Sequence, residues 1–233
     1  MNDPSTCEGA LQISHYWICC APFFETTLLV MPPPSRQRAA ERSSAASILR
    51  LYDADGYLAN EVMVEFSYDQ VGVIELEPLM AGCKFQAGLK HGHLEVHSPP
   101  GFSELCRIHT REGASQMSAP VLLSNTRRVF FPLLFSTERV SLLCLINAGE
   151  TEAVLRGRFF CAKRSPEATW EVPGRGARVI SLTSEFSEYL EAGPTSQVQA
   201  YIRIGVRNDC LVGAQLIDRT KGPKEGSFFS AIS

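Results

Sequence analysis

The sequence predicts an all-β protein made of two tandem antiparallel β-sandwich modules, with at most very short helices. Three observations predict it: several segments alternate between apolar and polar residues, turn-forming residues separate them, and the second half repeats the pattern of the first. Of the 233 residues, 45% are hydrophobic and 20% are charged, which is typical of a folded protein. The chain is long enough for two ordinary domains.

The first clear strands lie between residues 47 and 66. Residues 47–52 alternate, meet the turn signal Asp53-Ala54-Asp55-Gly56, and are followed by residues 61–66, which alternate again. The spacing of the two aspartates also matches the first ligand positions of a calcium-binding loop. Because Val64 stands where that loop needs a glutamate, we predict a hairpin turn instead.

The longest alternating segment is residues 198–206, whose apolar residues fall on one face of a strand. Helical turns are expected only near residues 76–81 and 184–191. Many short strands separated by Gly, Pro and Asp turns predict a sandwich or a barrel.

A repeat becomes visible when the chain is shifted by 108 residues. Leu94, Val96, Cys106 and Ile108 then fall on Ile202, Ile204, Ala214 and Leu216, and residues 119–123 fall on 227–231. Residues 27–30 match 141–144 and residues 73–76 match 179–182 at slightly different offsets. Because the matched segments keep their order, we predict a duplication, with module one at residues 10–125 and module two at residues 126–233.

Composition excludes several classes. A net charge of −3 gives no general attraction to nucleic acid or anionic lipid. The apolar residues 16–31 are too short and too interrupted to span a membrane, and no export signal is visible, so a cytoplasmic location is expected. The eight cysteines are therefore expected to be reduced, several of them as small apolar core residues.

In module two, residues 144–153 read CLINAGETEA, a strand that ends in Asn-Ala-Gly with acidic residues in the turn. The strands at 178–180, 199–206 and 210–218 then follow, with a polar helical turn after the first of them. This order resembles the soluble sensory rhodopsin transducer family. The resemblance implies cytoplasmic β-sandwich proteins that associate as homotetramers and couple a membrane photoreceptor to downstream events.

Family members usually have one module, and module one here lacks Asn-Ala-Gly. The resemblance therefore implies a fold and self-association rather than a rhodopsin partner, and it supplies no catalytic residues.

The strongest candidate site is the segment Lys90-His91-Gly92-His93-Leu94-Glu95-Val96-His97. Residues two apart share a face of a strand, so His91, His93, Glu95 and His97 lie together on one side. Neighbours on that face lie roughly 6.5–7 Å apart, so two or three imidazoles can converge on a zinc ion. Cys106 or His109, on the next strand, is the expected fourth ligand.

Two other interpretations of this face stay open. Module two has Gln199, Tyr201, Arg203 and Gly205 at the equivalent positions, which is typical of a hydrated outer face or of a face packed on another module. In a packed face, protonation of His91, His93 and His97 near pH 6–6.5 would add positive charge and could switch assembly.

Aromatic pairs at residues 23–24, 130–131 and 228–229 recur near the module edges. Each pair places one ring on each face of a strand, so one ring fills the core and the other meets a second module or subunit. We therefore predict interface residues at Phe24, Phe131 and Phe229, together with Tyr201 and Arg203.

No nucleophile motif, glycine-rich phosphate loop or C-x-x-C pair occurs, so no catalytic residue and no cofactor other than zinc is predicted. We expect a non-enzymatic cytoplasmic protein that acts in binding, signalling or assembly through oligomerising β-sandwich modules. The alternative is a metal-binding protein or metal-dependent hydrolase centred on His91, His93 and His97. A further one is a purely structural or extracellular adhesion-like module, which disulfides would support. The expected partners are further copies of the chain, a signalling protein or a small-molecule ligand; nucleic acid and membrane insertion are not expected.

Overall fold

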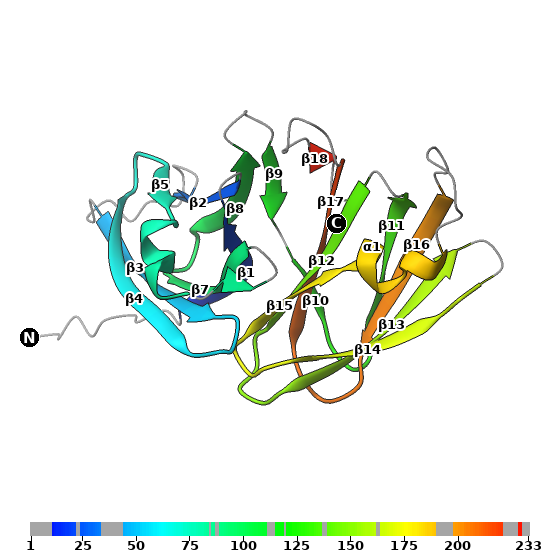
Figure 1. Ribbon diagram of the computed structural model, residues 1–233. Coiled ribbons are helices and arrows are strands. Elements are labelled where there is room, and N and C mark those ends of the chain that lie inside the picture. Colours follow the sequence, from blue (N-terminus) through cyan, green and yellow to red (C-terminus); the bar gives the residue numbers. More distant parts are fainter. Residues whose placement is uncertain are drawn as a thin grey trace, which may run out of the picture.

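The computed structural model describes residues 11–21, 24–33, 44–83, 85–86, 89–110, 115–118, 120–136, 139–161, 164–189, 198–220 and 228–229. In this part of the chain nearly all regular structure is strand, arranged in four antiparallel sheets (Figure 1). The predicted all-β class is confirmed. No helix among these residues is long and apolar enough to cross a membrane.

Sheets A and B form the first sandwich. Sheet A has the order β1 (Gln12–Cys20), β7 (Leu89–Ser98), β3 (Ser44–Asp53) and β4 (Leu58–Ser67), and β6 (Phe85–Gln86) also pairs with β7. Sheet B has the order β5 (Gly72–Glu75), β2 (Phe24–Met31), β8 (Ser103–Thr110) and β9 (Ser115–Ser118).

Sheets C and D form the second sandwich. Sheet C has the order β10 (Val121–Leu123), β17 (Val212–Thr220), β12 (Arg139–Asn147) and β15 (Ala177–Ser181), and β18 (Phe228–Phe229) also pairs with β17. Sheet D has the order β11 (Arg128–Phe135), β16 (Val198–Val206), β13 (Ala153–Cys161) and β14 (Glu167–Val172).

The two sandwiches have the same topology. Sheet D follows the order β11-β16-β13-β14 and sheet A the order β1-β7-β3-β4, while β15-β12-β17 of sheet C matches β5-β2-β8 of sheet B. The helical turn η2 (Pro78–Gly82) follows β5, just as α1 (Leu182–Glu185) and η3 (Ser187–Tyr189) follow β15. Such a shared order is the arrangement that a duplicated module would give.

The alternation of residues in each strand builds the two cores. In β16, Ile202 and Ile204 are fully buried in the second sandwich, and their counterparts in β7, Leu94 and Val96, are fully buried in the first. The predicted hairpin turn after β3 is also present. There the side chain of Asp53 accepts hydrogen bonds from the amides of Asp55 and Tyr57.

A third apolar cluster joins the sandwiches. It combines residues of the first sandwich with residues from the outer face of sheet C: Trp17, Cys19, Ala21, Phe24, Leu89, Ile108, Leu142, Cys144, Ile146, Ala177 and Ile217. Strands β1 and β7 of sheet A therefore pack on sheet C, with Phe24 and Ile108 of sheet B reaching the same cluster, and Figure 1 shows the two sandwiches side by side. The far end of the outer face of sheet A, with Ile13 and Met63, remains exposed.

Two details of the predicted repeat were wrong. Leu28 lies in the core of the first sandwich, whereas Leu142, its predicted match, faces the other sandwich, so that alignment is off by one residue and exchanges the two faces. The second is residues 121–123, which were placed in module one. They form β10, which pairs with β17 of sheet C.

Candidate functional site

The histidine strand β7 turns its odd-numbered side chains toward the second sandwich. His91, His93 and Glu95 are at most 6% exposed, and β7 contacts β12 and β15 of sheet C. His97, farther along the strand, is only half-buried. Of the alternatives that the sequence left open, the structure thus shows a face that is packed on another module.

His93 is joined to both sandwiches by its two ring nitrogens. Its Nδ1 lies 2.9 Å from the carbonyl oxygen of Arg175 in the second sandwich, and its Nε2 lies 3.0 Å from Nδ1 of His15 in the first. Because a carbonyl oxygen only accepts, His93 donates from Nδ1 and accepts a hydrogen bond from His15 at Nε2. Burial lowers the pKa of His93 to about 4, so the ring is neutral at pH 7.

His91 is also buried, beside Trp17, with ring centroids 6.1 Å apart. Neither of its ring nitrogens has a hydrogen-bond partner in the described part of the chain. Burial lowers the pKa of His91 to about 4. An imidazole in this setting costs free energy, which the apolar packing around it must offset.

Glu95 is the charged centre of the same face. Nε2 of His97 lies 2.5 Å from its carboxylate, and the guanidinium groups of Arg50 and Arg175 lie 3.7 and 4.0 Å from it. Burial is the largest single influence and opposes ionisation of this carboxyl group, but the hydrogen bond with His97 and the electrostatic effect of the neighbouring histidines together outweigh it, and the pKa of Glu95 is lowered. An ionised carboxylate is thus held between cations from both sandwiches.

Arg175 reaches this network from the turn between β14 and β15. Its φ of 58° is in the left-handed region, which is uncommon for a residue with a side chain. Its guanidinium group donates to the Tyr52 hydroxyl and to Glu150, both at 2.6 Å. The turn packs so tightly on the turn after β3 that a Cβ on Gly56 would lie 2.0 Å from the carbonyl oxygen of Gly174. The two turns therefore interlock the sandwiches.

The histidines do not converge on one point. No group of three or more His, Cys, Asp or Glu side chains within the described ranges is arranged to hold a metal ion. The expected fourth ligand was wrong, because Cys106 and His109 lie on β8, which pairs with β2 in sheet B and not with β7. His109 lies instead 3.3 Å from Glu25 of that sheet. Zinc binding by His91, His93 and His97 therefore stays the alternative hypothesis, for which metal analysis is the test.

The seven described cysteines are all buried. Burial raises the pKa of Cys19 to about 12 and those of Cys20 and Cys83 to about 11. A thiol with so high a pKa is a poor nucleophile at neutral pH, so these groups behave as packing residues.

The outer face of sheet D carries an exposed aromatic cluster, which we call face D. Its apolar members are Phe130, Pro132, Leu134, Phe160 and Tyr201. Phe130 is 55% exposed and Tyr201 41%. The Tyr201 ring stacks on Phe160 with centroids 4.4 Å apart, and Phe130 lies 6.0 Å from it.

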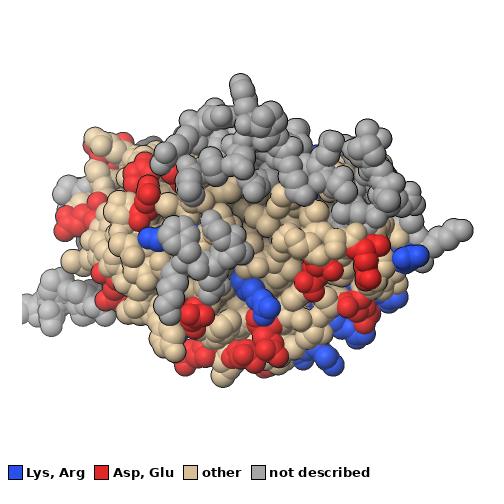
Figure 2. Space-filling model, in the orientation of Figure 1, with Lys and Arg blue, Asp and Glu red and all other residues tan. Residues whose placement is uncertain are grey.

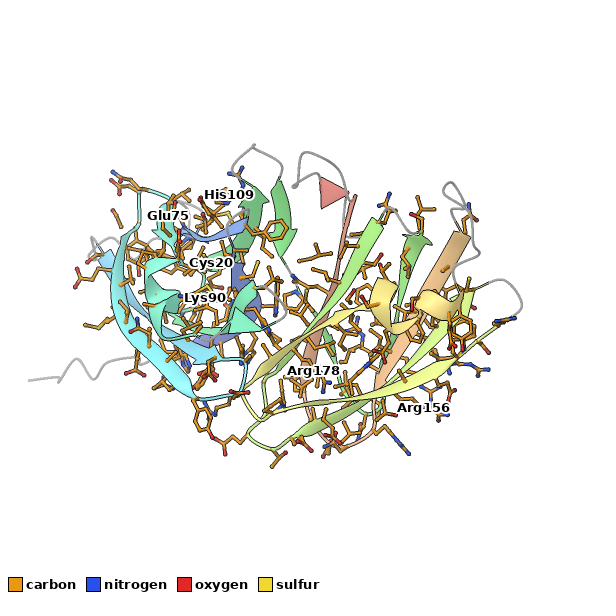
Figure 3. All side chains as sticks on the ribbon, in the orientation of Figure 1. Cys20, Glu75, Lys90, His109, Arg156 and Arg178 are labelled. Carbon is orange, nitrogen blue, oxygen red and sulfur yellow. The ribbon has the colours of Figure 1, made fainter. Side chains whose placement is uncertain are left out.

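Guanidinium groups complete face D. Arg158 and Arg203 lie 5.2 and 5.7 Å from the centroid of the Phe160 ring, and Arg156 and Arg158 both pair with Glu167. Arg156 lies on the side of the second sandwich away from the first (Figure 3). Among the described residues on the side shown in Figure 2, basic side chains lie mainly over the second sandwich, where acidic ones are interspersed with them. Exposed aromatic rings with arginine are typical of protein–protein interfaces.

Face D is the topological counterpart of the buried face of sheet A. Tyr201 pairs with Pro132 and Phe160 in the same way that His93 pairs with Trp17 and Tyr52. One strand further along each sheet, Arg158 pairs with Glu167 as Arg50 pairs with Glu61. The same position is therefore covered by a neighbouring sandwich in the first module and exposed in the second.

The predicted interface residues lie in different parts of the structure. Phe24 lies in the cluster between the sandwiches, and Tyr201 and Arg203 lie on face D. Phe131 is 1% exposed in the core of the second sandwich, so the interface assignment within this pair was wrong and its neighbour Phe130 is the outward ring. The side chain of Phe229 lies outside the described residues.

Phe160 was missed by the sequence analysis. Its signal was present in the alternation of residues 153–161, which places Phe160 opposite the buried Phe159.

Comparison with known proteins gives no family. No protein-family model matches the chain, and no curated protein sequence matches it. Among solved structures, a chain of infectious bursal disease virus Gt strain is similar at 9% identity with a TM-score of 0.20. The match covers 91% of this chain and 59% of the viral one, so this chain spans less than two thirds of that protein. At this identity and TM-score the similarity carries no structural or functional argument.

Proposed function

We propose that this chain is a non-enzymatic cytoplasmic binding or assembly protein that acts through the outer faces of its β-sandwich modules. One observation carries the proposal: face D exposes Phe130 and Tyr201, although the equivalent face of sheet A is buried against another sandwich. The protein thus already uses this position once as an interface within the chain, and the second example has no covering sandwich among the described residues.

The composition of face D supports binding rather than catalysis. Its rings are held by stacking and by neighbouring guanidinium groups, so they are preorganised and lose little side-chain freedom on contact. A signalling role rests only on the sequence resemblance to the rhodopsin transducer family.

The proposal is tested by reversing the chemistry of face D. Tyr201→Glu and Phe130→Glu each place a carboxylate in the cluster, and Tyr57→Glu is the matched control because Tyr57 is 71% exposed outside face D. Chemical cross-linking of the full chain in its native cells, followed by mass spectrometry, should show cross-linked complexes that both face D variants lose and the control retains. Cross-linked complexes that persist unchanged in both variants would contradict the proposal.

A further inference from the structure

We propose that the partner of face D is a second copy of this chain, which docks through the outer face of its sheet B, so that chains associate head to tail. The inference rests on the proposed function, because it names the partner of face D. The chain itself shows how the two kinds of face fit, since the outer face of sheet A already packs on the outer face of sheet C.

The outer face of sheet B, which we call face B, is the counterpart of that covered face of sheet C. In sheet B, Leu29 pairs with Val73 on one side and with Leu105 on the other. In sheet C, Cys144 pairs in the same way with Val179 and Gln215. The contact between the outer faces of sheets A and C within one chain therefore has an equivalent, in which face D of one chain packs on face B of another.

Face B has the apolar surface that such a contact needs. Val73 is 62% exposed, and the neighbouring Val71 and Met31 are 54% and 36% exposed. Leu29 and then Leu105 follow Val73 across the sheet, and both are half-buried. Adjacent exposed apolar side chains of this kind mark interaction sites on folded proteins.

The charges of the two faces are compatible. Face D carries Arg156, Arg158 and Arg203 together with Glu167, which pairs with Arg156 and Arg158, and Glu171. The outer face of sheet B carries Glu25 and Glu75 beside Arg107. Contact of face D with another face D would instead bring arginine clusters together, which costs free energy. The complementary pairing of D with B is therefore favoured over the symmetric one.

A contact between two different faces leaves one face of each kind free at the ends of every dimer. Association can therefore continue, and it closes into a ring or grows as an open chain, depending on the rotation between neighbours. The expected signature is a mass that rises with protein concentration beyond that of a dimer.

Two variants, each with one face blocked, test this geometry. Tyr201→Glu blocks face D and Val73→Glu blocks face B, while Tyr57→Glu is again the exposed control. Sedimentation velocity and light scattering on the purified full chain should give concentration-dependent species above the monomer for the unaltered protein and for the control. Each blocked variant should be a monomer with an unchanged circular dichroism spectrum and melting temperature.

The decisive step is to mix the two blocked variants. One intact face D and one intact face B remain, so the mixture should form a dimer, doubling the mass, and should grow no further. A mixture that stays monomeric, or a Val73→Glu protein that still dimerises by itself, would overturn the head-to-tail contact. If the unaltered protein is a monomer but cross-links to another protein in a way that depends on Tyr201, this inference fails while the proposed function stands.

Discussion

Nδ1 of His93 lies 2.9 Å from the carbonyl oxygen of Arg175, which is 82 residues away in the chain and belongs to the other sandwich. This bond places a histidine that the sequence marks as a metal-ligand candidate inside an interface between modules. Beside this bond, the guanidinium group of Arg175 forms an ion pair with Glu95 and donates a hydrogen bond to the hydroxyl of Tyr52. The histidine strand thus has a structural role in holding the modules together.

The buried histidines should make the protein less stable in mild acid. The pKa of His91 and of His93 is about 4 in the folded chain, against an ordinary value of 6.5. A group with a lowered pKa binds its proton more readily when unfolded, so its contribution to stability is complete above pH 6.5 and is lost as the pH falls toward 4. For each histidine the free energy of unfolding should fall by up to about 1.4 kcal/mol per pH unit in this window. Urea unfolding at several pH values measures the slope, and a slope for His93→Gln equal to that of the unaltered chain would refute the buried neutral ring.

The interlocked turns should make Gly56 far less tolerant than Gly101. Both glycines have positive φ, 88° and 93°, so alanine strains the backbone equally at the two sites. A Cβ at position 56 would lie 2.0 Å from the Gly174 carbonyl oxygen, whereas at position 101 its nearest neighbour is Cβ of Pro33 at 3.3 Å. Gly56→Ala should therefore lose at least about 1 kcal/mol more stability than Gly101→Ala. Thermal unfolding of both proteins measures this difference, and equal losses would show that the turns do not touch in solution.

Arg175 and Tyr52 should be energetically coupled across the modules. Their hydrogen bond is 2.6 Å long and part-buried, so a double-mutant cycle of Arg175→Ala and Tyr52→Phe should give a coupling of about 0.5–1.5 kcal/mol. Arg178→Ala is the control, because Arg178 donates to Glu171 within the second sandwich. That variant should show no coupling to Tyr52→Phe, and a coupling as large as that of Arg175 would remove the case for a specific bond.

Metal content tests the remaining alternative. Since His93 donates to a backbone carbonyl and His97 bonds to Glu95, we expect less than one equivalent of zinc per chain, by elemental mass spectrometry, even after incubation with zinc. His93→Ala should not change the result. A full equivalent that is lost in this variant would restore the metal-site hypothesis.

The fold class was predictable from the local alternation of apolar and polar residues, because this alternation depends only on which residues share a face of a strand. The offset that matched β7 to β16 was also visible, since Leu94 and Val96 correspond to Ile202 and Ile204 in both cores. The match of residues 27–30 failed by one position, because a run of apolar residues such as 142–146 is buried on both faces and does not reveal its inward side.

What covers a face could not be predicted from the sequence. The alternation put His91, His93 and His97 on one side of β7, but a hydrated face, a metal site and an interface share that pattern. Arg175 gave no signal either, because its contact with His93 depends on how two turns meet. The choice between Phe130 and Phe131 likewise depended on the register of β11 against β16.

The most direct test of the interaction surface is nitration of tyrosines in the assembled protein, followed by peptide mass spectrometry. Tyr201 and Tyr57 are both exposed in the isolated chain, at 41% and 71%. If face D is the contact surface, Tyr201 should be protected at high protein concentration and become reactive on dilution, while Tyr57 reacts equally in both conditions. Equal modification of Tyr201 at all concentrations and in the presence of its native cell extract would contradict the assignment of face D as the functional surface.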